Sequence, residues 1–385
     1  MMNEFYMLGI AAVAGAGSCA MCLLIICSQR WHGKHSLDHD LAGAQKFHVT
    51  AVPRIGGIAV FAGVALAVVT CMALLPAVFP TQYVNQAMKL LLASLPAFCA
   101  GIVEDLTKHV SVKVRLTATV VSALMGAWLL GAVITSLDLW GVDNLLLFVP
   151  AALLLTALAV AGGANAINII DGFNGLAGSV VVIMMVALGF LAWRVGDGLV
   201  LTLALLGGGA ACGFLVLNFP TGRLFLGDGG AYFLGFWTAE LAVLLLVRNP
   251  SVNAWQVSSL CAYPVIEVLF SMYRRKIIRK SSPGAPDGLH LHTLLYRRVA
   301  PRLVRRHGKA GWVRNAAVTC LVAPAIAALA GLTLLVGNSF AGAGAMVCLQ
   351  VALYLIVYKR LVRGRWWQAP ASYRAVAGET KVKLS

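Results

Sequence analysis

Long apolar stretches that follow one another along the chain are the feature that most restricts its fold. Eleven such stretches of about 20 residues occur in 385 residues, the length of a helix that crosses a bilayer. Membrane β-strands are shorter and alternate apolar with polar residues. The composition agrees, because 60% of the residues are apolar and only 11% are charged, against about 25% charged in soluble domains. The sequence therefore predicts an all-α membrane protein with about eleven transmembrane helices. The predicted spans are 5–29, 55–79, 88–104, 116–134, 147–164, 177–194, 199–218, 231–248, 254–273, 314–336 and 342–359.

The distribution of basic residues predicts the orientation of these helices. Lys and Arg collect in the cytoplasmic loops of membrane proteins. If the N-terminus lies outside, every Lys and Arg except Lys89, Arg194 and Arg248 falls on the cytoplasmic side. We therefore expect a periplasmic N-terminus and a cytoplasmic C-terminus. The formal charge of +16 then reflects topology, and no nucleic-acid partner is expected.

One membrane domain is predicted, over residues 1–360. It includes a large cytoplasmic loop, 274–314, and is followed by a basic cytoplasmic tail, 361–385. The nine cysteines are odd in number and lie in apolar segments, so we interpret them as small residues buried in the lipid bilayer rather than as a metal site.

Five short segments at the predicted cytoplasmic ends of the spans carry the polar residues. They supply carboxylates, amides, glycines and two histidines, with Lys and Arg nearby. Carboxylate and amide oxygens suit Mg²⁺, which takes one or two protein carboxylates together with substrate phosphates. Gly-rich turns let backbone N–H groups approach phosphates, and basic side chains neutralise phosphate charge. The set predicts metal-assisted phosphoryl transfer at a membrane surface. The segments are KFHVTAVPRIGG (46–57), VEDLTKHVSVKVR (103–115), NAINIIDGFNGLAG (165–178), FLGDGGAYFLG (225–235) and PDGLHLHTLL (286–295).

In their order and their amino-acid sequences, these segments resemble the polyprenyl-phosphate N-acetylhexosamine-1-phosphate transferase family, from about Lys46 to His292. The family includes phospho-MurNAc-pentapeptide translocase and the bacterial GlcNAc-1-phosphate transferases of surface-polysaccharide synthesis, whose layout of eleven spans fits better. The resemblance implies that undecaprenyl phosphate attacks the sugar-bearing phosphorus of a UDP-N-acetylhexosamine such as UDP-GlcNAc. UMP leaves, and a lipid-diphosphate sugar forms. It also implies a Mg²⁺ cofactor, with Mn²⁺ as an alternative, and a multi-pass enzyme of the bacterial inner membrane that initiates a polysaccharide such as lipopolysaccharide O-antigen.

The resemblance assigns metal and catalytic roles to five residues. Asp228 and Asn168 would hold the metal, and Asp171 would be the catalytic-site aspartate. Glu104 and Asp105 occupy a paired-aspartate position, with Glu104 in place of the usual Asp. A helix N-cap is the alternative for Asp228, and a solvated pair at a helix end is the alternative for the Glu-Asp pair.

The remaining assigned residues are predicted to bind substrate. The resemblance implies that Asn174 contacts uracil and that the imidazoles of His290 and His292, spaced as in an extended loop, both turn to the diphosphate or sugar. For the basic residues, including the unassigned Arg115, anchoring at the cytoplasmic surface is an alternative. The predicted substrate-binding residues are Lys46, His48, Arg54, Gly57, Lys113, Asn165, Asn174, Gly227, His290 and His292.

Two acidic residues lie inside predicted spans, where a carboxylate is costly. For Glu267, an internal ion pair with Arg274 or Arg275 is the simplest expectation. For Glu240, in mid-span, we expect a hydrogen bond between helices.

Three other functions are weighed against the transferase. A secondary transporter of a lipid-linked or anionic substrate would carry its polar residues near the bilayer midplane, whereas here they gather at one face. An enzyme of the CDP-alcohol type needs acidic residues downstream of Asp171-Gly172 that are missing. Phospho-MurNAc-pentapeptide translocase is disfavoured by Thr293, which stands where a further histidine is frequent. The identity of the sugar and the polysaccharide pathway stay open.

Overall fold

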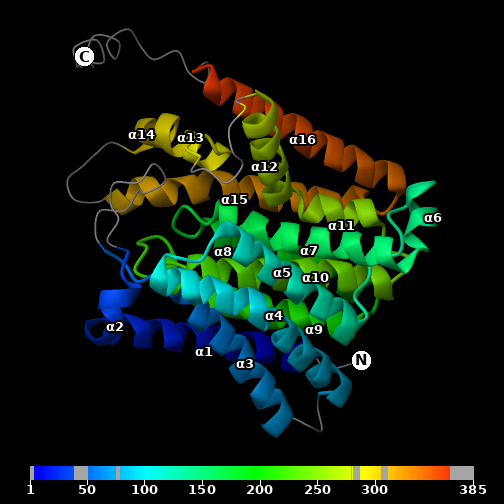
Figure 1. Ribbon diagram of the computed structural model, residues 1–385, viewed down its shortest axis with the longest axis horizontal. Coiled ribbons are helices and arrows are strands. Elements are labelled where there is room, and N and C mark those ends of the chain that lie inside the picture. The colour runs from blue at the N-terminus through cyan, green and yellow to red at the C-terminus, as the bar shows by residue number, and fades with distance from the viewer. Residues whose placement is uncertain are drawn as a thin grey trace.

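Helices make up nearly all of the ordered structure. The computed structural model describes residues 4–38, 51–74, 79–278, 280, 287–304 and 311–364. In this part of the chain, ten helices are long and apolar enough to cross a membrane, and the only β-structure is an isolated bridge. Figure 1 shows most of the long helices running in one general direction. The predicted all-α membrane class is confirmed. The ten helices are α1 (Glu4–Cys27), α3 (Gly56–Leu74), α4 (Thr81–Thr107), α5 (Val112–Leu130), α7 (Val149–Ile170), α8 (Leu176–Arg194), α9 (Gly198–Asn218), α10 (Gly227–Arg248), α15 (Gly311–Val336) and α16 (Phe340–Val362).

The stretch predicted as the ninth span, 254–273, is not one helix. It forms α11 (Ala254–Leu260) and α12 (Ala262–Tyr273), and α12 turns away from the direction of the bundle (Figure 1). Pro264 lies in the first turn of α12, and a proline cannot donate a helical hydrogen bond to the residue four positions earlier, here Leu260. Ten helices, rather than eleven, therefore have the length of a span.

Shorter helices connect the long ones. Two of them, α13 and α14, lie beside α15 in Figure 1, and a π-helical turn, η1, continues α12. The shorter elements are α2 (Gln29–Ser36), α6 (Val142–Leu146), η1 (Arg274–Ile278), α13 (Leu291–Arg298) and α14 (Ala300–Leu303).

Helix α10 is the most enclosed of the ten, and glycines set its first turn close to its neighbours. A Cβ on Gly57 of α3 would lie 2.2 Å from the backbone nitrogen of Gly230, and a Cβ on Gly101 of α4 would lie 2.5 Å from the Cα of Gly229. No side chain fits in either gap, so the backbones of α3 and α4 touch the start of α10. The position of this turn is therefore fixed by direct backbone packing.

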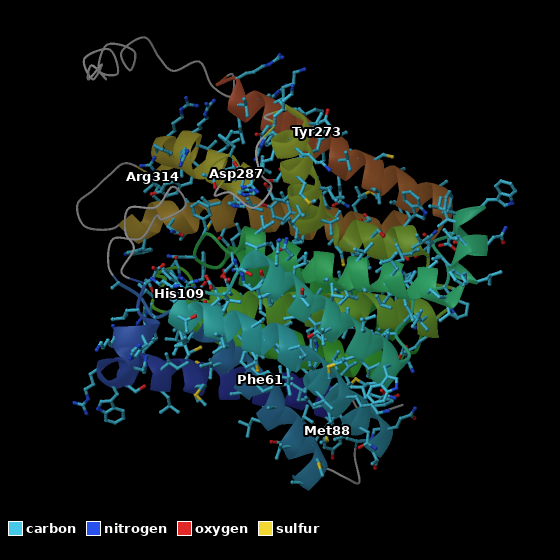
Figure 2. The ribbon with its side chains drawn as sticks, viewed as in Figure 1. Phe61, Met88, His109, Tyr273, Asp287 and Arg314 are labelled. Carbon is cyan, nitrogen blue, oxygen red and sulfur yellow. The ribbon has the colours of Figure 1, made fainter. Side chains whose placement is uncertain are left out.

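Aromatic rings fill the same interface deeper in the bundle. The rings of Phe61 and Phe98 stack with centroids 4.6 Å apart, and the ring of Phe233 meets Phe61 edge-on at 5.3 Å. Figure 2 shows Phe61 at the level of α3. These rings join α3, α4 and α10 into one core beneath the first turn of α10.

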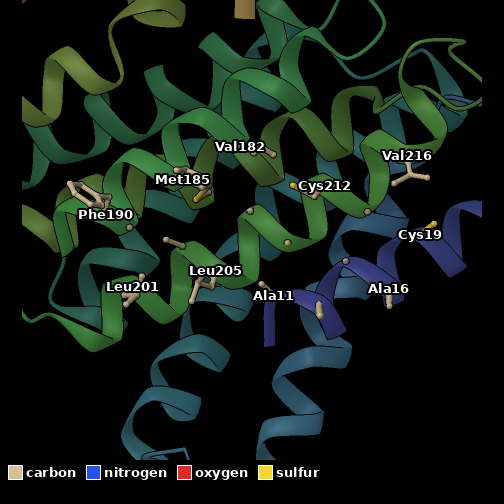
Figure 3. Close-up of a pocket in the computed structure, with 18 residues that line it drawn as sticks. Ala11, Ala16, Cys19, Val182, Met185, Phe190, Leu201, Leu205, Cys212 and Val216 are labelled. Atoms are coloured by element: carbon tan, nitrogen blue, oxygen red, sulfur yellow. The ribbon is translucent and has the colours of Figure 1, made fainter. Parts of the chain in front are cut away.

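A cavity of about 620 Å³ lies between α1, α8 and α9 (Figure 3). Small residues line it on α1, larger apolar residues such as Met185 and Phe190 line it on α8, and both kinds line it on α9. No charged side chain belongs to its lining. The cavity therefore does not contain the carboxylates that the sequence analysis singled out.

Candidate active site

Three of the predicted acidic and amide residues, Asp105, Asn168 and Asp171, lie close to Asp228 in the first turn of α10. They come from the ends of α4 and α7, and two arginines join them from the start of α5 and from the segment before α3. This end of the bundle carries His109, just after α4, and Arg314, in the first turn of α15, both toward the left of Figure 2. Segments more than 100 residues apart in sequence thus meet at one place, as the hypothesis of a shared site requires.

Asp105 holds the start of α10. Its Oδ1 accepts the backbone N–H of Asp228 at 2.9 Å, and its Oδ2 accepts that of Gly229 at 2.9 Å. Arg54 donates from Nε to Oδ1 at 3.1 Å. The first N–H groups of a helix have no partner within the helix, so Asp105 supplies the cap of α10 from a different helix. Its side chain is fully buried, which suits positioning, whereas its predicted catalytic role stays a prediction.

Asp228 projects from the same turn toward three other groups. Asn168 donates from Nδ2 to its Oδ1 at 3.0 Å, Arg54 lies 3.8 Å away, and Arg115 binds its Oδ2. The N-cap position of α10 is Leu226, and Asp228 is the second residue of the helix. The capping alternative for Asp228 is therefore wrong, because Asp105 accepts the first N–H groups instead.

Asp171 lies directly after α7 and close to Asp228. Burial raises the pKa of Asp171 to about 7, and the negative charge of Asp228 acts in the same direction. Arg54 and the backbone N–H of Gly227 oppose this shift. Asp171 therefore has a carboxyl that takes up and releases a proton near neutral pH.

Gly227 is required by both space and backbone conformation. Its φ is +73°, a region that residues with a side chain rarely adopt. A Cβ here would lie 1.9 Å from the carbonyl oxygen of Arg54 and 2.6 Å from Oδ2 of Asp105. Gly227 thus lets Arg54 and Asp105 approach the start of α10, and its predicted contact with substrate stays a prediction.

The three predicted amide side chains, on α7 and just after it, occupy two environments. Asn165 and Asn168 lie in the last turns of the helix, which continues to Ile170 rather than ending at 164 as predicted. Asn174 is buried beyond the helix, where its Nδ2 donates to the carbonyl of Pro220 at 2.9 Å and its backbone N–H donates to Oδ1 of Asn315 at 2.6 Å. Asn174 therefore ties the loop after α7 to its neighbours, and its contact with uracil stays a prediction.

The two predicted histidines stack on each other, with ring centroids 5.2 Å apart, but they face different partners. His290 approaches Glu267, with Nδ1 2.9 Å from Oε1. His292 lies edge-on to Phe173 at 5.7 Å, and its Nε2 is 3.9 Å from the position of a Cβ on Gly172. The expected extended loop is wrong at this point, because α13 begins between the two residues. Only His292 borders the Asp171-Gly172 turn.

The protonation of His292 follows from its surroundings. Burial lowers the pKa of His292 to about 4, although the charge of Glu267 opposes this shift. Its Nδ1 has no hydrogen-bond partner in the described part of the chain. At neutral pH, His292 is therefore a neutral imidazole beside the candidate site.

The expected ion pair of Glu267 with Arg274 or Arg275 is wrong. Glu267 pairs instead with His290, and it also accepts the backbone N–H of Leu291. Arg274 binds Asp287, which Figure 2 places beside α12 and α13. The break between α11 and α12 and the start of α13 bring these groups together, and the linear sequence gave no sign of this pairing.

Several predicted residues lie elsewhere. Lys46 and His48 fall outside the described residues. Lys113 is exposed, whereas Arg115, two positions later, reaches Asp228. Glu104 accepts the backbone N–H of Val110 at 2.8 Å, so it fixes the turn after α4. Sequence reasoning therefore missed Arg115, because nothing in the local sequence separated it from Lys113.

The donor groups near Asp228 suit a hard divalent cation. Asp228, Asp171 and the amide of Asn168 offer oxygen ligands, and Mg²⁺ needs few of these because water and phosphate complete its shell. Rotation of the amide would turn its oxygen toward Asp228. No cluster of three His, Cys, Asp or Glu side chains with metal-binding geometry occurs in the described residues. The site therefore fits an ion held partly by a substrate better than one held by protein alone.

Comparisons with known proteins point to the same segments. The family model described as Glycosyl transferase family 4 matches residues 87–246, which include Asp105, Asp171 and Asp228. Undecaprenyl-phosphate alpha-N-acetylglucosaminyl 1-phosphate transferase of Yersinia pestis is 30% identical over 272 residues, 67% of this chain and 69% of the relative. Probable undecaprenyl-phosphate N-acetylglucosaminyl 1-phosphate transferase of Bacillus subtilis is 28% identical over 260 residues, 66% and 68% of the two chains. Decaprenyl-phosphate N-acetylglucosaminephosphotransferase of Mycobacterium tuberculosis is 29% identical over 274 residues, 64% and 65% of the two chains.

The fold and the site together define a polytopic membrane enzyme of the phosphotransferase class. The chain belongs to the polyprenyl-phosphate N-acetylhexosamine-1-phosphate transferase family, glycosyl transferase family 4. The resemblance drawn from the five segments is confirmed.

Proposed function

We propose that the protein transfers an N-acetylhexosamine-1-phosphate from a UDP-sugar to undecaprenyl phosphate. An oxygen of the lipid phosphate bonds to the sugar-bearing phosphorus, the bond from that phosphorus to UMP breaks, and UMP leaves. The product is the lipid-diphosphate sugar that begins a surface polysaccharide such as O-antigen. The names of the relatives support this reaction and favour N-acetylglucosamine as the sugar.

The observation that carries the proposal is the arrangement around Asp228. Its carboxylate lies between the guanidinium groups of Arg54 and Arg115 at the start of a helix. Helix N-termini and guanidinium groups both favour phosphate. Because Asp105 already accepts two N–H groups of this turn, the guanidinium groups are well placed to bind a diphosphate in their stead.

Asp228 and Asn168 would hold Mg²⁺. The bound ion would neutralise negative charge on the diphosphate oxygens, and Mn²⁺ is an alternative. Arg115 would then exchange its bond to Asp228 for a bond to phosphate, and Arg54, which is held by Asp105, would bind phosphate beside it. Oxygen ligands in one cluster and two guanidinium groups within ion-pair distance of Asp228 support this assignment.

Asp171 is suited to accept a proton from the lipid phosphate. A catalytic acid or base works best when its pKa lies near the working pH, and the pKa of Asp171 is raised to about 7. His292 stays neutral beside the same turn and offers a donor or an acceptor for the sugar or phosphate. His290 pairs with Glu267 and is therefore better placed to position His292 than to bind substrate.

We further propose that the site faces the cytoplasm from the bacterial inner membrane. The short helices beside the site carry exposed or half-exposed Arg297, Arg298 and Arg302, as expected for a cytoplasmic surface. A transporter would place its polar groups near the middle of the bundle, whereas these groups gather at one end. Nucleotide sugars are cytosolic, so the proposed orientation gives the donor direct access.

Purified protein in nanodiscs tests the proposal. With undecaprenyl phosphate, UDP-[¹⁴C]GlcNAc and Mg²⁺, we expect equal amounts of UMP and labelled lipid. UDP-GalNAc and UDP-MurNAc-pentapeptide, run in parallel, identify the preferred sugar. Omission of Mg²⁺, with and without Mn²⁺, tests the cofactor. If no UDP-sugar yields lipid-linked product from folded protein, the proposed reaction is wrong.

A further inference from the structure

Two helices that carry site residues make a second contact deep in the bundle. Arg115 lies in the first turn of α5 and binds Asp228, in the first turn of α10. Further along the same helices, the carboxyl of Glu240 on α10 packs directly onto Gly126 on α5. Both helices start at the site, so they run parallel. Each of the two contacts joins one residue of α5 to one residue of α10.

The contact of Glu240 with Gly126 is tight and has no room for a side chain on α5. A Cβ on Gly126 would lie 2.1 Å from Oε1 and 2.6 Å from Cδ of Glu240. Glu240 is fully buried, and neither of its oxygens has a hydrogen-bond partner among the described residues. An ionised carboxylate without donor or cation is very costly in an apolar interior. Glu240 therefore contributes shape and polarity at this contact rather than charge.

The two contacts lie at matching heights along the helices. Gly126 follows Arg115 by 11 residues, and Glu240 follows Asp228 by 12. At 1.5 Å per residue, these separations are roughly 16 Å and 18 Å. A change in the distance between α5 and α10 at the deeper contact therefore moves Arg115 relative to Asp228. Helix α5 packs mainly against α4 and α7, and both of these also pack against α10. They hold the two helices together, and the contact of Glu240 with Gly126 is where α5 and α10 themselves meet below the ion pair.

We propose that Glu240 is a positioning residue, which rests on the bare backbone of Gly126 and sets the spacing of α5 and α10 so that Arg115 meets Asp228. The effect of this spacing on catalysis rests on the proposed function. The spacing itself does not, because the ion pair joins two side chains of this chain. Glu240 thus touches neither substrate nor metal and acts through Arg115.

A thermodynamic cycle measures the ion pair without any turnover. Arg115→Ala, Asp228→Asn and the double variant are melted in detergent. If the two side chains interact, the Tm change of the double variant differs from the sum of the single changes, and we expect a difference of about 4 °C. The cycle is then repeated in the Gly126→Val background. Valine is chosen because the end of the Glu240 side chain could swing away from an alanine, whereas a branched side chain leaves it no space.

We expect the non-additive Tm change to disappear in Gly126→Val. Gly162→Val on α7 is the matched control, because nothing lies within 4 Å of a Cβ there, and it keeps the full difference. Glu240→Ala makes room for the valine, so the combination of Glu240→Ala with Gly126→Val recovers the non-additive Tm change. If Gly126→Val leaves the non-additive change intact, the proposal is wrong. If Gly126→Val does not fold, the cycle is measured in Glu240→Gln and in Glu240→Ala instead. Glu240→Gln should keep the non-additive Tm change, and Glu240→Ala should reduce it. An equal non-additive change in these two backgrounds would overturn the proposal.

Turnover provides the functional readout. We expect Gly126→Val to lower kcat about tenfold in the wild-type background and to have no further effect in Arg115→Ala, because both act through one contact. An equal loss in both backgrounds would indicate a general structural defect and would contradict the proposal. If the wild-type protein shows no turnover, the proposed function fails, while the melting cycle still tests the spacing.

Discussion

Asp105, near the end of α4, caps α10 by accepting the backbone N–H of Asp228 at 2.9 Å. One carboxylate thus fixes the backbone from which another carboxylate, that of Asp228, projects. Because the cap comes from a different helix, the position of Asp228 depends on the packing of α4 against α10. The paired-aspartate segment and the GlyAspGlyGly turn, which are far apart in sequence, therefore form one structural unit.

The first prediction concerns this cap. Asp105→Ala leaves two buried N–H groups and Arg54 without their acceptor, so we expect the free energy of unfolding to fall by about 3 kcal/mol. Thermal melting in detergent measures this loss. Lys113→Ala, at an exposed position near the start of α5, is the control and should change the Tm much less. A melting curve of Asp105→Ala that overlays the wild type would show that the cap contributes nothing to stability.

The second prediction separates Asp228 from Asp105. Asp228 is partly exposed and does not cap its helix, so Asp228→Ala should fold with a Tm within a few degrees of the wild type. Mg²⁺-dependent turnover should fall by a factor of about 10³. Turnover is followed as release of UMP. Near wild-type activity in this variant would remove the metal assignment.

The third prediction compares two neighbouring basic residues. Arg115 binds Asp228, whereas Lys113 is exposed. Arg115→Ala should lower turnover by a factor of about 10², and Arg115→Lys should recover only part, because an ammonium group lacks the planar fork of guanidinium. Lys113→Ala should stay within about twofold of the wild type, as expected for exposed surface positions. Equal losses at both positions would mean that a general positive surface, rather than one ion pair, serves the site.

The long helices and the acidic site residues could be predicted from the sequence because each has a local signal. Apolar length marks a span, and the order of the five segments marks Asp105, Asp171 and Asp228. The break in the ninth span had only an ambiguous signal. Pro264 coincides with it, yet Pro96 lies inside α4 and Pro324 inside α15 without ending either helix. A proline alone therefore does not tell where a helix ends.

Pairing between distant side chains was the part that sequence could not supply. Glu267 has Arg274 and Arg275 nearby along the helix, which made an ion pair the natural expectation. The turn of α12 instead brings His290 to Glu267 and leaves Arg274 to Asp287. Such choices depend on the directions of α12 and α13, which no local pattern encodes.

The last prediction concerns the pH dependence of stability at His292. Burial lowers its pKa to about 4 in the folded protein, whereas an unfolded chain has a value near 6.5. Between these values the unfolded state binds more protons than the folded state, so stability falls as pH decreases from 6.5 to 4. Below pH 4, this contribution is constant. We expect His292 alone to account for a loss of about 3 kcal/mol over the window.

Melting curves of the wild type and His292→Gln between pH 7.5 and 4.5 measure this effect, since glutamine does not titrate. The Tm of the variant should fall less steeply below pH 6.5 than that of the wild type. His109→Gln, at an exposed histidine after α4, is the control and should keep the wild-type slope. Parallel curves for wild type and His292→Gln would show that His292 is protonated as readily in the folded protein as in the unfolded chain, and the neutral imidazole beside Asp171 would have to be abandoned.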